Sequence, residues 1–361
     1  MASTISDLQI DFNTTKATNG LRLEDFVEYR ISLKIHLYVL PILVSVGIPG
    51  NIVSFVVLVF STFRKSTTSI YLATMAILDT VILILSILWF ISFYHPEVKI
   101  FRDGTCQFIH LVFYFAIHFN VLVLVAMTVE RFIAVVFPLK APSLISTKKA
   151  SIVITGIGLF SFALNLHHVF TKGMITSADG SSSCWIVGDE PTKFFVGKIY
   201  PWIDSFIYSI LPMTSLFVLN IVMIVTMNRA MQSRHTMHGS RSNSSGDVGQ
   251  RQLTVMLLLV SFAFLVLTGP MGILLLLSRY TWHPETLGEL AVSKLTHSVV
   301  DNMMYANHAI NFVFYCMSGR RFRDEVRKMF CFTCTRKEAA PLHPGTFQNS
   351  TEMVTSVSTI L

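Results

Sequence analysis

Three carboxylates stand within long apolar stretches of the sequence, and each is the only charged side chain of its stretch. Asp79 lies near the middle of one stretch, whereas Asp204 and Asp301 lie nearer to the ends of two others. An ionised group without a partner is costly in an apolar environment, so such residues are usually functional. Carboxylate oxygens bind metal cations, and they also form charge-assisted hydrogen bonds with cationic ligands. These three positions are therefore the first candidates for ion or ligand binding.

A fourth carboxylate has a cation directly beside it. Glu130 and Arg131 follow the apolar stretch Gln107–Val129, which carries no charge of its own. The Glu130 carboxylate can pair with the Arg131 guanidinium and hold it away from other partners. The alternative is an arginine at a helix end that only extends its charged head toward water.

Seven apolar stretches must position these side chains. The chain has 361 residues, of which 52% are hydrophobic and 14% are charged, and its mean hydropathy is +0.59. Soluble domains carry about 25% charged residues, so the composition excludes a soluble enzyme, a disordered protein and a disulfide-rich secreted domain. Each stretch can cross a hydrocarbon layer of about 30 Å, and we predict an all-α membrane protein, a seven-transmembrane helix bundle over residues 36–318. The predicted spans are Leu37–Phe60, Ile70–Phe93, Gln107–Val129, Ala150–Phe170, Ile203–Met227, Gln252–Ser278 and Leu295–Ser318.

The distribution of charges predicts which side of the membrane each end of the chain faces. The loops after the first, third and fifth spans and the C-terminal tail hold 16 Lys and Arg and 5 acids, a net charge of +11. The opposite side holds 11 Lys and Arg and 12 acids, a net charge of −1. The positive-inside rule thus makes residues 1–35 an extracellular N-terminal segment of a plasma-membrane protein. That segment has no apolar run, so the first span is expected to direct insertion. Basic residues gathered on one membrane face do not indicate nucleic-acid binding.

Cysteines and a glycosylation sequon agree with this orientation. Cys106 and Cys184 lie on the outer side, where oxidising conditions favour disulfides, and we predict that they are bonded. Of three N-x-[ST] sequons, the one at Asn13 alone would meet the glycosylation machinery.

The C-terminal region carries signals for lipids and regulatory partners. Residues 319–332 are basic and amphipathic and predict a short helix along the membrane, followed by a disordered cytoplasmic tail over 333–361. Cys331 and Cys334 are candidates for palmitoylation, which would add a contact with membrane lipids; a zinc site is the alternative, but no second ligand pair is nearby. The tail is rich in Ser and Thr, so its phosphorylation would create an acidic arrestin-binding segment. Its end, Thr359–Leu361, resembles ligands of PDZ domains.

Several short motifs fall on the predicted spans in a consistent order. They are Gly50-Asn51, Ala76 with Asp79, Cys106 placed 25 residues before Arg131, Glu130-Arg131-Phe132, Pro212, Phe264 with Pro270, Asn311 with Tyr315, and Gly319–Arg323. In this order they resemble the rhodopsin-like (class A) G-protein-coupled receptors over about residues 36–332. The sequence departs from the family pattern in its lack of a fourth-span tryptophan, at Asn220, at Thr268 in place of the sixth-span tryptophan, and at Phe312 in place of the seventh-span proline.

The resemblance implies roles for the residues of the inner half. On activation Arg131 leaves Glu130 and reaches toward a heterotrimeric G protein. The other residues of this rearrangement would be Phe132, Phe264, Pro270, Asn311 and Tyr315. If the helices pack as in the family, Asp79 faces Asn120, Asn307 and Asn311, whose oxygens suit a sodium ion. The alternative is a hydrogen-bonded cluster around a protonated Asp79, and no other cofactor is expected.

The resemblance also implies a ligand site at the outer end of the bundle. Asp204 and Asp301 would receive a cationic group there, which suits a peptide that carries arginine or a terminal amide. The surrounding aromatic and imidazole side chains are Trp89, Phe113, Tyr114, His297 and Tyr305. Packing in the core or at the membrane interface is the alternative for several of them. The segment 311–332 resembles invertebrate FMRFamide-type receptors, which implies a neuropeptide ligand.

Other functions make different demands on the sequence. A seven-span transporter or channel would need repeated halves and a continuous polar path, and the sequence shows neither. A membrane-embedded enzyme would need His and Asp clustered near one membrane face, whereas these residues are scattered. A receptor for a non-peptide small molecule stays open. We therefore expect a non-enzymatic receptor that binds an extracellular ligand and activates G proteins.

Overall fold

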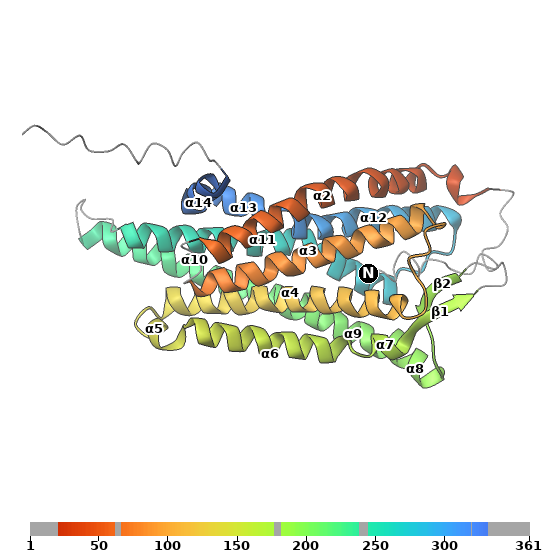
Figure 1. Cartoon of the computed structure of the whole chain (residues 1–361), viewed down its shortest axis with the longest axis horizontal. Helices are drawn as coiled ribbons and strands as arrows, with labels where there is room; N and C mark the ends of the chain where they lie inside the picture. The colour runs from red at the N-terminus through yellow and green to blue at the C-terminus, as the bar shows by residue number, and fades with distance from the viewer. Residues whose placement is uncertain (1–20, 62–65, 177–181, 238–244, 319, 331–361) are drawn as a thin grey trace, which may run out of the picture.

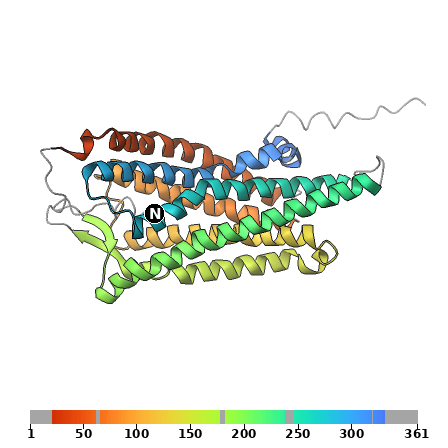
Figure 2. The same cartoon turned by 180° about the vertical axis from the view of Figure 1, so that it is seen from behind.

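Long, roughly aligned helices make up the body of the protein in the computed structural model, with two short strands at one end and α5 and α14 toward the other (Figure 1, Figure 2). The structure describes residues 21–61, 66–176, 182–237, 245–318 and 320–330. Its helices are η1 Leu23–Asp25, α2 Val27–Phe60, α3 Thr67–Tyr94, α4 Thr105–Val136, α5 Ala141–Leu144, α6 Thr147–Asn165, α7 His168–Thr171, α8 Glu190–Phe194, η3 Phe195–Ile199, α9 Tyr200–Ser205, η4 Phe206–Ile210, α10 Leu211–Met237, α11 Ser245–Tyr280, α12 Leu287–Ala309, α13 Asn311–Ser318 and α14 Arg320–Phe330.

Six helical segments in the described part of the chain are long and apolar enough to cross a membrane. They contain the first six predicted spans almost completely, with the fifth built from α8, α9 and α10 joined by the π-helical turns η3 and η4. The seventh predicted span is divided between α12 and α13, and α12 buries several polar side chains that lower its hydropathy. The predicted all-helical bundle is therefore confirmed, with an interruption in its last span.

The interruption between α12 and α13 lies at Ile310. The Ile310 N–H still donates to the carbonyl of Ala306, 3.0 Å away, so α12 ends with its last turn closed. Since the residue in the family's proline position is Phe312, this break does not depend on a proline ring. The Phe312 side chain instead packs against Phe322 of α14, with ring centroids 6.2 Å apart.

Two spans extend farther than their apolar stretches. Helix α2 begins at Val27, so helix precedes the boundary expected at residue 36. The fifth span starts at α8, where the Asp189 carboxylate accepts hydrogen bonds from the hydroxyl and the backbone N–H of Thr192, and these hydrogen bonds lower its pKa. Both extensions contain charged residues among their apolar ones, so they lie outside the apolar stretches that define the predicted spans.

A β-hairpin, which the sequence analysis did not anticipate, lies at the same end of the bundle as α7 and α8 (Figure 1). Strands β1 Lys172–Thr176 and β2 Ser182–Ile186 pair antiparallel, and Met174 lies opposite Cys184. The hairpin places Cys184 beside the start of α4, where the predicted disulfide partner is found.

The amphipathic helix predicted over 319–332 is present as α14. Its residue Phe322 is buried and contacts Tyr315 of α13, with ring centroids 5.6 Å apart. The predicted glycosylation site Asn13, the lipidation sites Cys331 and Cys334, and the tail 333–361 lie outside the described residues.

Close packing of α2 against α3 and α12 depends on Gly47. A Cβ atom at this position would lie 2.6 Å from Leu83 Cδ1 and 2.8 Å from Ala309 Cβ. Gly47→Ala is therefore expected to destabilise the bundle by about 1–3 kcal/mol, the usual cost of overpacking. Thermal unfolding of the detergent-purified protein measures the loss.

Gly156 supplies a matched control in α6, because a Cβ atom there would have no neighbour within 4 Å. Gly156→Ala should leave the melting temperature unchanged or slightly raised, since alanine favours helix more than glycine. Equal destabilisation by the two substitutions would contradict the packing argument.

Candidate functional site

A cavity opens between α2, α3 and α12, near the end of the bundle that is predicted to face outward. Its enclosed volume is about 90 Å³, which is smaller than the roughly 300–1,000 Å³ of most small-molecule pockets, so the site is a shallow one that could receive a single side chain. Two predicted ligand-binding residues, His297 and Asp301, lie on its wall. The full lining is Tyr29, Ser32, Leu33, His36, Phe93, Tyr94, Lys294, His297, Ser298 and Asp301. The cavity thus combines an acid, a base and several aromatic rings.

Asp301 is the acid of this cavity, and its side chain is only 3% exposed. Within the described ranges, no side chain or backbone group donates a hydrogen bond to its carboxylate. Lys294 lies seven residues earlier on the same helix and also lines the cavity. The two charges are therefore about 10 Å apart along the helix axis, at 1.5 Å per residue. The wall can receive a cationic group at one level and an anionic or carbonyl group at another.

Asp204, the other acid predicted for ligand binding, lies in a separate cluster. Its Oδ1 atom is 3.1 Å from Nε2 of His118. His118 in turn contacts Asn165 through Nδ1, at 3.1 Å, and the Tyr200 hydroxyl donates to Asn165 Oδ1 at 2.8 Å. This cluster joins α4, α6 and α9, so Asp204 has an internal partner and does not line the cavity that contains Asp301.

The remaining predicted ligand-binding residues are aromatic and pack within the bundle. The Trp89 and Phe113 rings meet edge to face with centroids 4.7 Å apart, and Phe113 is completely buried. Tyr114 and Tyr305 are also buried. For Phe113 the packing interpretation is therefore the better one.

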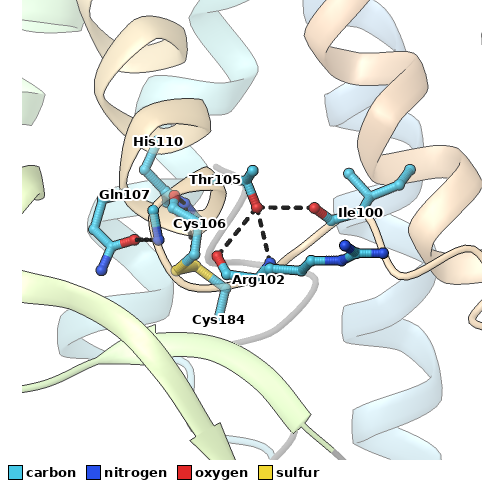
Figure 3. Close-up of a disulfide and its surroundings, with 8 residues drawn as sticks. Ile100, Arg102, Thr105, Cys106, Gln107, His110 and Cys184 are labelled. Atoms are coloured by element: carbon cyan, nitrogen blue, oxygen red, sulfur yellow. Dashed lines mark hydrogen bonds between the residues drawn. A yellow bond between two sulfur atoms is a disulfide. The ribbon is translucent and has the colours of Figure 1, made fainter.

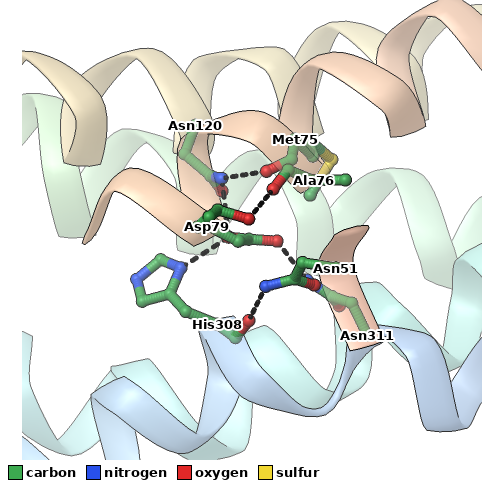
Figure 4. A network of polar contacts seen from close by, with 8 residues as sticks. Asn51, Met75, Ala76, Asp79, Asn120, His308 and Asn311 are labelled. Carbon is green, nitrogen blue, oxygen red and sulfur yellow. Dashed lines mark hydrogen bonds and ion pairs between the residues drawn. The ribbon is translucent and has the colours of Figure 1, made fainter. Parts of the chain in front are cut away.

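Asp79 lies at that polar centre and is 1% exposed (Figure 4). Its Oδ1 atom accepts hydrogen bonds from Asn120 Nδ2 at 2.8 Å and from His308 Nδ1 at 2.7 Å. Its Oδ2 atom accepts from Asn311 Nδ2 at 2.7 Å. Two of the predicted partners are therefore present, whereas His308 contacts Asp79 where Asn307 was expected. Asn51 joins the cluster by donating to the backbone carbonyl of His308 at 2.9 Å.

The predicted pairing of Glu130 and Arg131 is present at the inner end of α4. Arg131 Nη2 lies 2.8 Å from Glu130 Oε1, and both side chains are about nine-tenths buried. The hydroxyl of Thr67, at the start of α3, donates to the same carboxylate. Because Glu130 from α4 and Thr67 from α3 both contact the guanidinium, it is not merely extended toward water.

The other residues assigned to activation are mostly buried on the inner helices. Phe264 and Asn311 are each 4% exposed, and Tyr315 is 1% exposed. Phe132 is only half-buried and contacts Phe137, and Pro270 lies inside α11 without ending it. This arrangement brings Asn311 to Asp79 and places Tyr315 on the neighbouring turns of α13.

The predicted disulfide between Cys106 and Cys184 is present (Figure 3). Cys106 lies in the first turn of α4, which is fixed by a hydrogen bond from the Gly104 N–H to Gln107 Oε1. The bond connects this turn to β2 across a separation of 78 residues. It therefore anchors the hairpin over the end of the bundle that contains the cavity.

Comparison with known proteins identifies the arrangement. A family model described as "7 transmembrane receptor (rhodopsin family)" matches residues 50–315. The chain belongs to this family. Both its fold and its function as a G-protein-coupled receptor, with no enzymatic activity, follow from this membership together with the helical bundle.

The relatives of this receptor cover most of its length. Growth hormone secretagogue receptor type 1 from Oryctolagus cuniculus is 27% identical, with 80% of this chain and 78% of that protein aligned. Neuromedin-U receptor 2 from Rattus norvegicus is 25% identical, with 80% and 73% aligned. Cysteinyl leukotriene receptor 1 from Homo sapiens is 25% identical, with 78% and 80% aligned. The resemblance to FMRFamide-type receptors stays a prediction.

The sequence analysis missed three contributors to the receptor's polar sites. Thr67 is an ordinary threonine beside a loop, and His308 adjoins the asparagine that was selected instead. His118, which lies within the apolar third span, pairs with Asp204. A signal was available for His308, because an imidazole one residue from a predicted polar cluster in an apolar span requires a partner.

Proposed function

We propose that this receptor is activated by a peptide whose cationic group binds Asp301. The carboxylate carries the proposal, since it is buried, opens into the outer cavity and has no donor among the described residues. Aromatic rings of Tyr29, Phe93 and Tyr94 line the same cavity, which favours a guanidinium or an amine through cation–π contacts. Relatives named for growth hormone secretagogues and for neuromedin U are compatible with this proposal.

The second charge of the cavity favours a peptide over a simple amine. Lys294 lies about 10 Å from Asp301 along α12, which corresponds to about three residues of an extended peptide at 3.3–3.6 Å each. A ligand that spans both positions needs a cation at one end and a carbonyl or carboxylate at the other. A short peptide meets this requirement with its side chains and its backbone.

The proposal includes the orientation of the receptor and its regulatory partners. The Cys106–Cys184 disulfide and the charge distribution support an extracellular N-terminus, which would open the cavity to the outside. On the inner side we assign an arrestin site to the phosphorylated tail, lipid contacts to Cys331 and Cys334, and a PDZ-binding end to residues 359–361. The ligand signal would then reach the inner face through a shift between two states of the bundle.

Substitution of Asp301 tests the ligand site. A neuropeptide library is first screened on cells that express the receptor, with calcium and cAMP as readouts. Asp301→Asn should lower the potency of an active cationic peptide about 10- to 100-fold, because a charge-assisted hydrogen bond contributes about 1.5–3 kcal/mol. Asp103→Asn, a matched change at an exposed loop residue, should leave the potency unchanged.

Two outcomes would contradict the proposal. One is equal potency of the peptide at wild type and at Asp301→Asn when surface expression is matched. The other is activation by non-peptide mediators, such as leukotrienes, with no response to any peptide.

A further inference from the structure

The family resemblance implies a sodium ion at Asp79, and the donors around this carboxylate test that implication. A hard cation requires oxygen ligands around it. The groups that face the Asp79 oxygens are instead three nitrogens, from Asn120, His308 and Asn311, at 2.7–2.8 Å. Each nitrogen lies at hydrogen-bond distance and donates a hydrogen bond to the carboxylate. The donor set is therefore that of a hydrogen-bonded anion, and it does not fit a sodium ion.

The orientation of the Asn120 amide is supported by a second contact. Its Nδ2 atom also lies 3.5 Å from the backbone carbonyl oxygen of Met75, which can only accept. The nitrogen thus faces two acceptors on α3. Turning the amide to offer its oxygen to a cation would place that oxygen against both acceptors.

His308 is the residue that takes up the space beside Asp79. Its Nδ1 atom contacts Oδ1 directly, and the His308 side chain is 5% exposed. An ionised carboxylate has about four acceptor positions, and three of them are used by side chains in the described part of the structure. The neutral Nδ1–H form of the imidazole suffices for this contact, so the arrangement does not require a charged histidine.

We propose that the His308 imidazole replaces an allosteric cation, so that the receptor does not bind sodium at Asp79. The imidazole connects α12 to α3, and Asn120 connects α3 to α4 through the same carboxylate (Figure 4). The inner half of the bundle is thus held by donors built into the chain. Its stability is independent of the sodium concentration.

Thermal stability in different salts tests this proposal without a ligand. The full-length receptor is purified in detergent and melted in sodium chloride and in equimolar choline chloride. Wild type should melt at the same temperature in both salts. His308→Ser, which removes the imidazole and supplies an oxygen, should melt about 2 °C or more higher in sodium, because binding to the folded state stabilises it. Adding Asp79→Asn to this variant should abolish the difference.

Two control variants separate the site from a general effect of losing a buried imidazole. His308→Leu fills much of the space of the imidazole without supplying an oxygen and should remain insensitive to sodium. His168→Ser removes another buried histidine, in α7, and should also remain insensitive. Stabilisation of wild type by sodium that Asp79→Asn removes would overturn the proposal, and this comparison does not depend on whether His308→Ser folds. A folded His308→Ser variant with no sodium response would overturn it as well.

Discussion

Replacing Glu130 with glutamine is expected to raise signalling in the absence of agonist, and replacing Arg131 with alanine in the same chain is expected to abolish that signalling. In the present structure the Arg131 guanidinium is held 2.8 Å from the Glu130 carboxylate. Thr67 supports the carboxylate from α3 by donating its hydroxyl hydrogen. The pair therefore occupies the guanidinium, which in the expected mechanism must leave Glu130 before it can contact a G protein.

The magnitude follows from the loss of the charge. A hydrogen bond to a charged group contributes about 1.5–3 kcal/mol, and each 1.4 kcal/mol changes an equilibrium constant about tenfold. Glu130→Gln keeps an acceptor but removes the negative charge, so the active population should rise about tenfold until it saturates. Thr67→Val removes only the supporting donor and should produce a smaller rise.

Basal G-protein activation in membranes measures these effects without a ligand. Receptor density at the cell surface is matched first, because an unpaired arginine can also impair folding. Lys149→Ala changes an exposed residue of α6 on the side of the membrane that is predicted to be cytoplasmic. This variant should behave as wild type. If the Glu130→Gln/Arg131→Ala double variant kept high basal signalling, Arg131 would not be the residue that the pair restrains.

Of the contacts that the Glu130 carboxylate makes with Arg131 and with Thr67, the sequence could predict the first but not the second. Glu130 and Arg131 are adjacent in the chain, so their pairing needed no knowledge of the fold. Thr67 lies 63 residues from Glu130, and threonine is common at the start of helices. Its role depends on how closely α3 and α4 approach, which the pattern of apolar residues does not specify. The lengths of the apolar stretches and the order of the motifs therefore predicted the helical bundle. They did not predict that Thr67 contacts the Glu130–Arg131 pair.

The Asp79 cluster and the outer acids show the same limit. Asn307 and His308 are neighbours on α12, and successive residues of a helix point about 100° apart. The rotation of α12 about its own axis decides which of them faces Asp79, and the pattern of apolar residues does not specify that rotation. Likewise Asp204 and Asp301 lie near the same end of the bundle, yet they lie in different clusters because α9 and α12 lie on different sides of it. The spacing of residues in the sequence predicts how deep a side chain lies in the membrane. It predicts less reliably which neighbouring helix that side chain faces.

Loss of the disulfide is the second large effect that we expect. Cys106→Ser or Cys184→Ser should reduce the receptor at the cell surface to a small fraction of wild type. The bond closes a loop across 78 residues, and in the chain-entropy account a loop of this length stabilises the folded state by about 4.5 kcal/mol. The hairpin would lose its covalent attachment to α4, while its strand pairing alone is marginal in water.

The free cysteine of the described residues, Cys316 on α13, provides the matched control. Cys316→Ser changes the same atoms without breaking a bond, and it should leave surface expression nearly unchanged. Surface labelling of intact cells and melting of the purified receptor measure both substitutions. Dithiothreitol should lower the melting temperature of wild type and leave that of Cys184→Ser unchanged.

The double variant Cys106→Ser/Cys184→Ser separates the covalent bond from the packing of each cysteine. Because either single substitution already breaks the bond, the double variant should lose little more than a single one. Additive losses would mean that the two cysteines act independently, which contradicts a disulfide in the cellular protein. Non-additive losses at both positions would show that the covalent tie to α4 fixes the hairpin. The proposed cation site at Asp301 is on α12 and shares no residue with the disulfide, so any remaining surface receptor should keep its sensitivity to Asp301→Asn.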